Sequence, residues 1–95
     1  MRIEWRPAAA DDFADLIAAA GKISAGMASE RKAMIESKIL LLERFKDFGR
    51  KTRRPGVREL ALETAPVVIV FRVADGVILV LRMFGIDPKL AAVAR

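Results

Sequence analysis

Cysteine, histidine and tyrosine are absent from this 95-residue chain, which contains one tryptophan and four prolines. Without cysteine, neither a disulfide framework nor a thiolate metal site can form. Without histidine and tyrosine, the chain lacks the most common general base, the most common metal ligand and the phenolic acid or base. Any catalysis must therefore rely on Arg, Lys, Asp, Glu, Ser or Thr. We expect no metal and no cofactor.

The sequence also lacks internal repeats, a glycine-rich phosphate loop and any long apolar run. Its longest apolar runs are strand-length, far below the roughly 20 residues of a membrane span. Charges begin at Arg2, so the N-terminus does not resemble a signal peptide, and we expect a cytoplasmic protein. The length suits one hydrophobic core but not two, which predicts a single domain over residues 1–95.

Positive charge is concentrated in the middle of the chain. The net charge of +5 suggests an acidic partner, either a nucleic acid or an acidic protein. The stretch 44–58 carries seven basic residues against Asp47 alone, and it leads directly into a predicted strand. The basic residues are Arg44, Lys46, Arg50, Lys51, Arg53, Arg54 and Arg58. Such a run is most often a solvated loop, but a phosphate backbone or an acidic peptide would also fit it.

The first residues alternate in polarity and then meet a proline. Ile3 and Trp5 are separated by a charged residue, which predicts a strand over 2–6 with these two side chains toward the core. Pro7 cannot continue a central strand but suits the first turn of a helix. Together these residues predict a strand that leads directly into a helix over 8–22.

Two helices are expected between residues 8 and 48. In the first, a buried apolar stripe follows the three-and-four spacing, and three aspartates lie on the solvent side near the N-terminus. The stripe is Phe13, Leu16, Ile17 and Ala20, and the aspartates are Asp11, Asp12 and Asp15. The second helix begins at Ser24 or Ser29 and ends at Phe48, before Gly49. Its expected apolar face is Met34, Ile35, Ile39, Leu41, Leu42, Phe45 and Phe48.

Three strands are expected in the last part of the chain, near 57–62, 66–73 and 77–84. The last two are apolar at both parities, which is typical of central strands. One helix hairpin covers only one side of such strands, so we expect an uncovered apolar side that a partner binds. Asp87-Pro88 favours a short helix over 89–95. The fold class is therefore α+β: an N-terminal strand, a two-helix hairpin, a three-stranded antiparallel meander and a short C-terminal helix.

Three arginines lie in these strands among residues expected in the interior. They are Arg58, Arg72 and Arg82. A buried guanidinium is costly unless it is paired or reaches water. The arginines therefore either form a cationic face for phosphate or carboxylate, or lie at strand ends, where they reach water or pair with glutamates. The candidate glutamates are Glu4, Glu59 and Glu63.

The turn at residues 74–76 decides where two of these arginines point. If Asp75 and Gly76 alone form a type I′ turn, Arg72 and Arg82 fall on opposite faces, because side chains alternate along a strand. If Ala74 joins them in a three-residue loop, both arginines share one face. We expect the three-residue loop, since one shared solvent-facing surface keeps charge out of the core.

The candidate binding surface combines the basic stretch with the strand arginines. Its residues are Arg50, Lys51, Arg53, Arg54, Arg58, Arg72 and Arg82. Few aromatic residues are available to stack on bases, so base-specific recognition is poorly supported. No residue is assigned a catalytic role. If the protein were a ribonuclease, the three strand arginines would surround the reacting phosphate.

The order of these elements resembles that of the RelE/ParE superfamily of type II toxin–antitoxin toxins. The matching pieces cover most of the chain from residue 2 to about 85. They are Trp5-x-Pro7, Asp12-Phe13-x-x-Leu16, Phe48-Gly49-Arg50, Arg54 to Leu60, Pro66 to Val73, and the strand from Ile78 to Arg82. The resemblance implies a small toxin that a cognate acidic antitoxin holds inactive in a hetero-oligomer.

Two activities occur in that superfamily, and the resemblance implies one or the other. RelE-like members resemble ribosome-dependent ribonucleases, with RNA and the ribosome as partners, whereas ParE-like members poison DNA gyrase. This chain has Phe84-Gly85 where many relatives carry His-Gly or a tyrosine, and Phe71 replaces a frequent tyrosine. A general acid or base contributes about 10²–10⁴-fold, and arginine is a poor base.

The ParE-like interpretation is therefore favoured, with gyrase as the target by resemblance. A RelE-like mRNA interferase that uses Glu59 or Glu63 as its base is one alternative. A non-toxic relic that only binds its antitoxin is the other.

Overall fold

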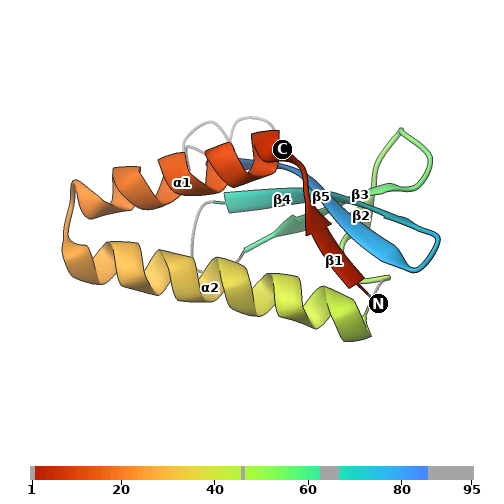
Figure 1. Cartoon of the computed structure of the whole chain (residues 1–95), viewed down its shortest axis with the longest axis horizontal. Coiled ribbons are helices and arrows are strands. Elements are labelled where there is room, and N and C mark those ends of the chain that lie inside the picture. Colours follow the sequence, from red (N-terminus) through yellow and green to blue (C-terminus); the bar gives the residue numbers. More distant parts are fainter. Residues whose placement is uncertain (1, 46, 63–66, 86–95) are drawn as a thin grey trace.

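The structure, a computed structural model, describes residues 2–45, 47–62 and 67–85, and its elements follow the expected order (Figure 1). Strand β1 spans Arg2–Trp5, helix α1 Pro7–Gly21 and helix α2 Ala25–Arg44. Strands β2 to β5 span Arg50–Lys51, Val57–Ala61, Val67–Ala74 and Val77–Gly85. The predicted α+β class, helix hairpin and strand meander are confirmed. The expected tail helix and Glu63 lie outside the described residues.

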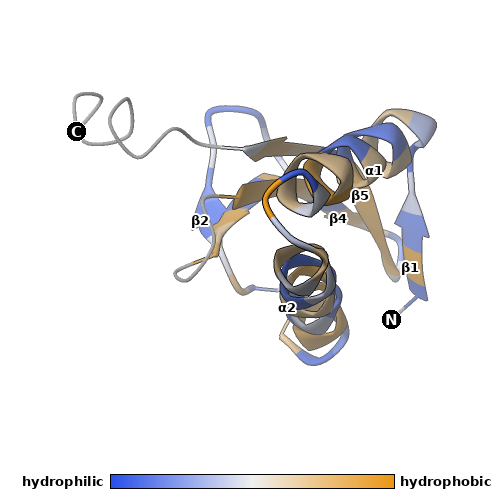
Figure 2. Ribbon diagram, turned by 90° about the vertical axis from the view of Figure 1, so that its left-hand side faces the viewer, coloured by the Kyte–Doolittle hydropathy of each residue, from blue (hydrophilic) through white to orange (hydrophobic). Residues whose placement is uncertain are grey.

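The strands form one sheet in the order β1-β5-β4-β3-β2. Strands β3, β4 and β5 form the antiparallel meander, and β1 joins it parallel to β5, from Arg2 opposite Val77 to Trp5 opposite Val80. Figure 2 shows β1 and β2 on opposite sides of the molecule. The two-residue strand β2 lies in the basic stretch that was expected to be a loop, and it pairs with β3.

Both helices begin where the sequence provides a start signal. Pro7 occupies the first turn of α1, where its missing N–H costs no hydrogen bond. The Ser24 hydroxyl caps α2 by accepting a hydrogen bond from the Met27 N–H at 3.0 Å. The hairpin therefore closes within a few residues, and α1 and α2 pack side by side.

The core lies between the helix hairpin and one face of the sheet. Along β4, Val67, Ile69 and Phe71 are buried, and the residues between them are less so. They pack with Ile35, Ile39 and Leu42 of α2. Trp5 contributes from β1 and meets Phe13 of α1 edge to face, with ring centroids 5.3 Å apart. The predicted inward orientation of Trp5 is thus confirmed.

The end of α2 differs from the prediction. The helix ends at Arg44, because Phe45 leaves the helical region with φ −124° and ψ 67°, so Gly49 does not end it. Phe45 and Phe48 are 53% and 42% exposed, and Leu41 also lies outside the core. The stripe of α2 that faces the sheet is therefore narrow and consists of Ile35, Ile39 and Leu42. Leu41 lies beside this stripe, and Phe45 and Phe48 follow the end of the helix.

Gly49 instead allows the chain to turn closely against β3. Its φ of +94° lies in the left-handed region, and a Cβ atom there would lie 2.6 Å from the Glu59 carbonyl oxygen. No other residue fits this position without moving the backbone. Glycine is therefore required at position 49, in the connection between α2 and β2.

We predict that Gly49→Ala lowers the free energy of unfolding by at least about 1–3 kcal/mol, because it combines a left-handed φ with a backbone clash. Urea denaturation measures the change. Gly21→Ala is the matched control: Gly21 ends α1, and its added Cβ would meet Ala28 at an ordinary 3.8 Å. That variant should be neutral or slightly more stable. Equal losses in the two variants would contradict the role of Gly49.

Candidate binding surface

The sheet face turned away from the helices carries an apolar strip with two arginines. The residues that alternate with the core are Val68, Val70 and Arg72 on β4, and Leu79, Arg82 and Phe84 on β5. We call this surface the outer face. The three aliphatic residues are half-buried, and Phe84 is 46% exposed. Within the described residues no helix covers it, as the apolar runs predicted.

Arg72 and Arg82 share the outer face, but the turn expected to bring this about is not present. Asp75 and Gly76 both have positive φ, 53° and 74°, and Ala74 pairs with Val77, so the turn has two residues. The prediction of a three-residue loop is wrong. The arginines share a face because Leu81 forms a bulge between the pairs Phe71–Val80 and Val70–Arg82, which shifts the register of β5 by one residue.

Arg82 connects the outer face to α1. Its Nε donates to Oδ2 of Asp12 at 2.6 Å, and its Nη2 donates to Oδ1 at 3.1 Å. The Met83 N–H also donates to Asp12 Oδ2, at 2.9 Å. This contact is possible because the pairing with β1 stops opposite Val80 and leaves the following edge of β5 open. The guanidinium also lies 5.3 Å from the Phe84 ring centroid.

The carboxylate of Asp12 is held in its charged form. Its pKa is lowered from the ordinary 3.8, first because Arg82 donates hydrogen bonds to it and also because the Met83 N–H does so, while partial burial opposes the shift. Asp12 was expected on the solvent side with Asp11 and Asp15. Its role depends on the bulge in β5, which leaves no clear signal in the sequence.

Arg58 lies on the other side of the sheet from Arg72 and Arg82. It pairs with Phe71, whose side chain faces the helices. Its Nη1 donates to the carbonyls of Asp47 and Gly49, at 3.1 and 3.4 Å, and its Nη2 lies 3.7 Å from Asp47 Oδ1. Arg58 therefore holds the connection between α2 and β2, and the structure does not bring it onto the outer face.

Arg50 lies on β2 opposite Glu59 and donates to its carboxylate at 3.3 Å. Of the glutamates suggested as partners of the strand arginines, Glu59 thus pairs with Arg50, and Glu4 pairs with Arg2 at 3.0 Å.

Four of the seven candidate residues have no ion pair within the part of the chain that the structure describes. They are Lys51, Arg53, Arg54 and Arg72, which we call the basic tip. Arg72 lies next to Gly56 of the β2–β3 loop. A Cβ atom added at Gly56 would be 3.8 Å from the Arg72 Nε.

The β2–β3 loop, which carries Arg53 and Arg54 of the basic tip, is closed by Thr52. The Thr52 hydroxyl donates to the Val57 carbonyl at 3.0 Å and accepts from the Arg54 N–H at 3.2 Å. These bonds bend the backbone, while the side chains of Arg53 and Arg54 stay exposed. A cavity of about 270 Å³ lies at this loop, and the cations among its lining residues are Lys51, Arg54 and Arg58. Such an arrangement suits the binding of phosphate or carboxylate.

Two further features bear on chemistry. Across residues 2–45, 47–62 and 67–85, no three His, Cys, Asp or Glu side chains lie close enough to hold a metal ion. Over the same residues, neither helix has the length and apolar character needed to cross a membrane.

Solved structures similar to this chain include a toxin–antitoxin system and an isolated toxin. A chromosomal ParDE toxin–antitoxin system from P. aeruginosa aligns with a TM-score of 0.80 and 28% identity, over 92% of this chain and 97% of that one. The isolated E. coli RelE toxin aligns with a TM-score of 0.70 and 11% identity, over 98% of this chain and 93% of that one. Protein HP0894 from Helicobacter pylori, described as conserved and hypothetical, aligns with a TM-score of 0.54 and 20% identity, over 87% of this chain and 91% of that one.

No protein-family model and no curated protein matches the sequence. The RelE structure and HP0894 support the fold alone, whereas the ParDE structure is also similar in sequence. The chain is therefore similar to RelE/ParE-like toxins of type II toxin–antitoxin systems, closer to ParE, as its motifs predicted.

We predict that Asp12→Asn destabilises the protein near neutral pH and not in acid. A carboxyl group whose pKa is lowered on folding contributes stability above its unfolded-state pKa, and this contribution is lost as the pH falls through the folded-state pKa. Urea unfolding between pH 2 and pH 7 measures the effect. Asp11→Asn is the control, because Asp11 is exposed. A pH-independent difference between wild type and Asp12→Asn would contradict the prediction.

Proposed function

We propose that this protein is a ParE-like toxin that binds and inhibits DNA gyrase and is neutralised by a cognate acidic antitoxin. The observation that carries the proposal is the similarity to the P. aeruginosa ParDE system, which extends over 92% of the chain at 28% identity. The basic tip and the uncovered apolar strip of the outer face support binding to an acidic, partly apolar partner.

The contacts of the strand arginines favour binding over hydrolysis. RNA cleavage requires a group that takes a proton from the 2′-hydroxyl, and the sequence contains no histidine or tyrosine for this purpose. The Glu59 carboxylate is engaged by Arg50, while Arg58 and Arg82 hold other parts of the fold. The arginines proposed for a ribonuclease are thus divided between two faces of the sheet.

One observation favours the RelE-like alternative. Arg72 has no ion pair among the described residues, and it adjoins the loop that carries Arg53 and Arg54 and follows Lys51 at the end of β2. A group of four cations at one end of a sheet is suited to an RNA backbone. A ribonuclease that relies on electrostatic stabilisation alone would use this group.

We predict that the purified chain inhibits DNA supercoiling by gyrase and does not cleave mRNA on ribosomes. Both assays use the same protein preparation, with and without the antitoxin encoded beside it, and the antitoxin should restore supercoiling. Cleavage of ribosome-bound mRNA with normal gyrase activity would replace the proposal by the RelE-like alternative. Antitoxin binding without either effect, and without growth arrest on expression, would identify a non-toxic relic.

We further predict that Arg72→Ala weakens both antitoxin binding and toxicity. Arg72 is exposed and unpaired within the described residues, so its loss should leave the fold intact. Each lost charge-assisted contact costs about 1.5–3 kcal/mol, or roughly ten- to a hundredfold in affinity. Titration calorimetry with the antitoxin and growth on induction measure the two effects.

Lys32→Ala, at an exposed position of α2, is the control for the loss of one positive charge. Arg82→Ala is a poorer test, because it also removes the link to Asp12. Unchanged antitoxin affinity in Arg72→Ala, together with the loss of a ribonuclease activity present in the wild type, would contradict the binding role.

A further inference from the structure

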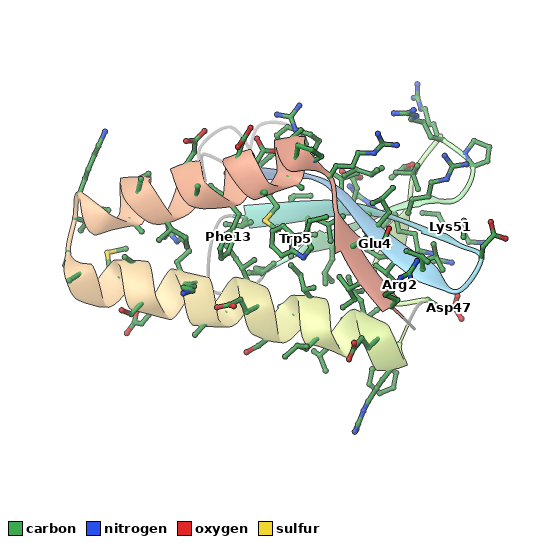
Figure 3. The ribbon with its side chains drawn as sticks, in the orientation of Figure 1. Arg2, Glu4, Trp5, Phe13, Asp47 and Lys51 are labelled. Atoms are coloured by element: carbon green, nitrogen blue, oxygen red, sulfur yellow. The ribbon has the colours of Figure 1, made fainter. Side chains whose placement is uncertain are left out.

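A groove separate from the outer face runs between β1 and α2. Its cavity has a volume of about 450 Å³, and Ile3, Trp5, Ile39 and Leu40 form its apolar lining. Figure 3 shows Trp5 beside Phe13, between the ribbons of the two helices. No residue of the basic tip lines the groove. Leu40 is 60% exposed, so apolar surface is open to solvent at the margin.

The margin of this groove is acidic, although the whole chain has a net charge of +5. Glu36 and Glu43 line it from α2, and both are exposed and without an ion pair within the described residues. They are seven positions apart in the helix, so they lie about 10 Å apart on one side of it, with Leu40 between them. Arg2 also reaches the groove, but its guanidinium is paired with Glu4 at 3.0 Å.

Among the described residues, strand β1 presents an open edge beside this groove. It is the terminal strand of the sheet, and the N–H groups of Arg2 and Arg6 donate to Gly76 and Val80 of the β5 side, at 3.1 and 2.9 Å. Because backbone groups alternate along a strand, those of Ile3 and Trp5 point away from β5, toward the open edge. The same two residues contribute their side chains to the groove.

We propose that the groove and the edge of β1 together bind an extended segment of a partner protein, in which an apolar residue is flanked by lysine or arginine. The segment adds a strand to β1 through the free backbone groups of Ile3 and Trp5, a common mode of peptide recognition. Its apolar side chain enters the groove beside Leu40, and its cations lie near Glu36 and Glu43. This site is independent of whether gyrase or the ribosome is the target.

The charges of the site distinguish this segment from the acidic partner of the basic tip. A chain with an excess of positive charge attracts acidic peptides in general, so selection of a basic peptide requires a local acidic site. The charged side chains of Arg2 and Glu4 on β1, and of Arg6 directly after it, also disfavour pairing of the strand with a second copy of itself. A single partner protein can contain both an acidic region and this basic segment.

A displayed peptide library tests the proposal. The full-length protein is used to select eight-residue peptides with Val, Ile, Leu or Phe at alternate positions and random residues between them. We expect enrichment of Lys and Arg at the random positions. Glu36→Gln and Glu43→Gln should each weaken a selected peptide about two- to fivefold, the range expected for one exposed ion pair. Glu30→Gln, at an exposed α2 position outside the groove, should have no effect.

Two measurements localise the bound peptide. Trp5 is the only tryptophan in the chain, so its fluorescence should change on titration with a selected peptide. Amide hydrogen exchange should slow at Ile3 and Trp5, whose N–H groups face the open edge. Enrichment of acidic residues, no enrichment, or binding that leaves both the Trp5 fluorescence and these two amides unchanged would each overturn the proposal.

Discussion

One unpaired residue in β5, Leu81, determines how the last strand meets the rest of the fold. With continuous pairing from the two-residue turn, Arg82 would lie opposite Ile69 and point among the core residues. The bulge places it opposite Val70 instead, on the outer face, and returns Met83 to the core at 2% exposure. A guanidinium among those aliphatic side chains would carry a desolvation cost that one ion pair rarely offsets. The link from β5 to Asp12 of α1 also depends on this register.

The architecture could be predicted from the sequence because it follows from polarity patterns. Each pattern fits one type of element with its apolar side buried. The alternation around Trp5 fits a strand, the spacing through Leu42 fits a helix, and the apolar runs of β4 and β5 fit central strands. The bulge could not be predicted, because no residue type marks it, and with it the partner of Arg82 was missed. The candidate site was only partly predictable, because charge density located the basic stretch but not the contacts that engage Arg50, Arg58 and Arg82.

Pairing divides the arginines of this sheet into two kinds. Arg58 holds the connection from α2 to β2 against the sheet, and Arg82 holds the first half of α1, so both act within the fold. Arg72 and the loop cations remain available to an outside anion. A count of basic residues in a strand therefore says little about binding until the carboxylates and carbonyls within reach are known.

The parallel contact between β1 and β5 also bears on the order of folding. Arg2 pairs with Val77, so β1 is synthesised 75 residues before the strand with which it pairs. The helix hairpin and the meander are local and can form earlier, but closing this long loop comes late and slows folding. During translation β1 has no partner within its own chain until β5 emerges. The sheet is therefore completed only after nearly all the described residues have left the ribosome.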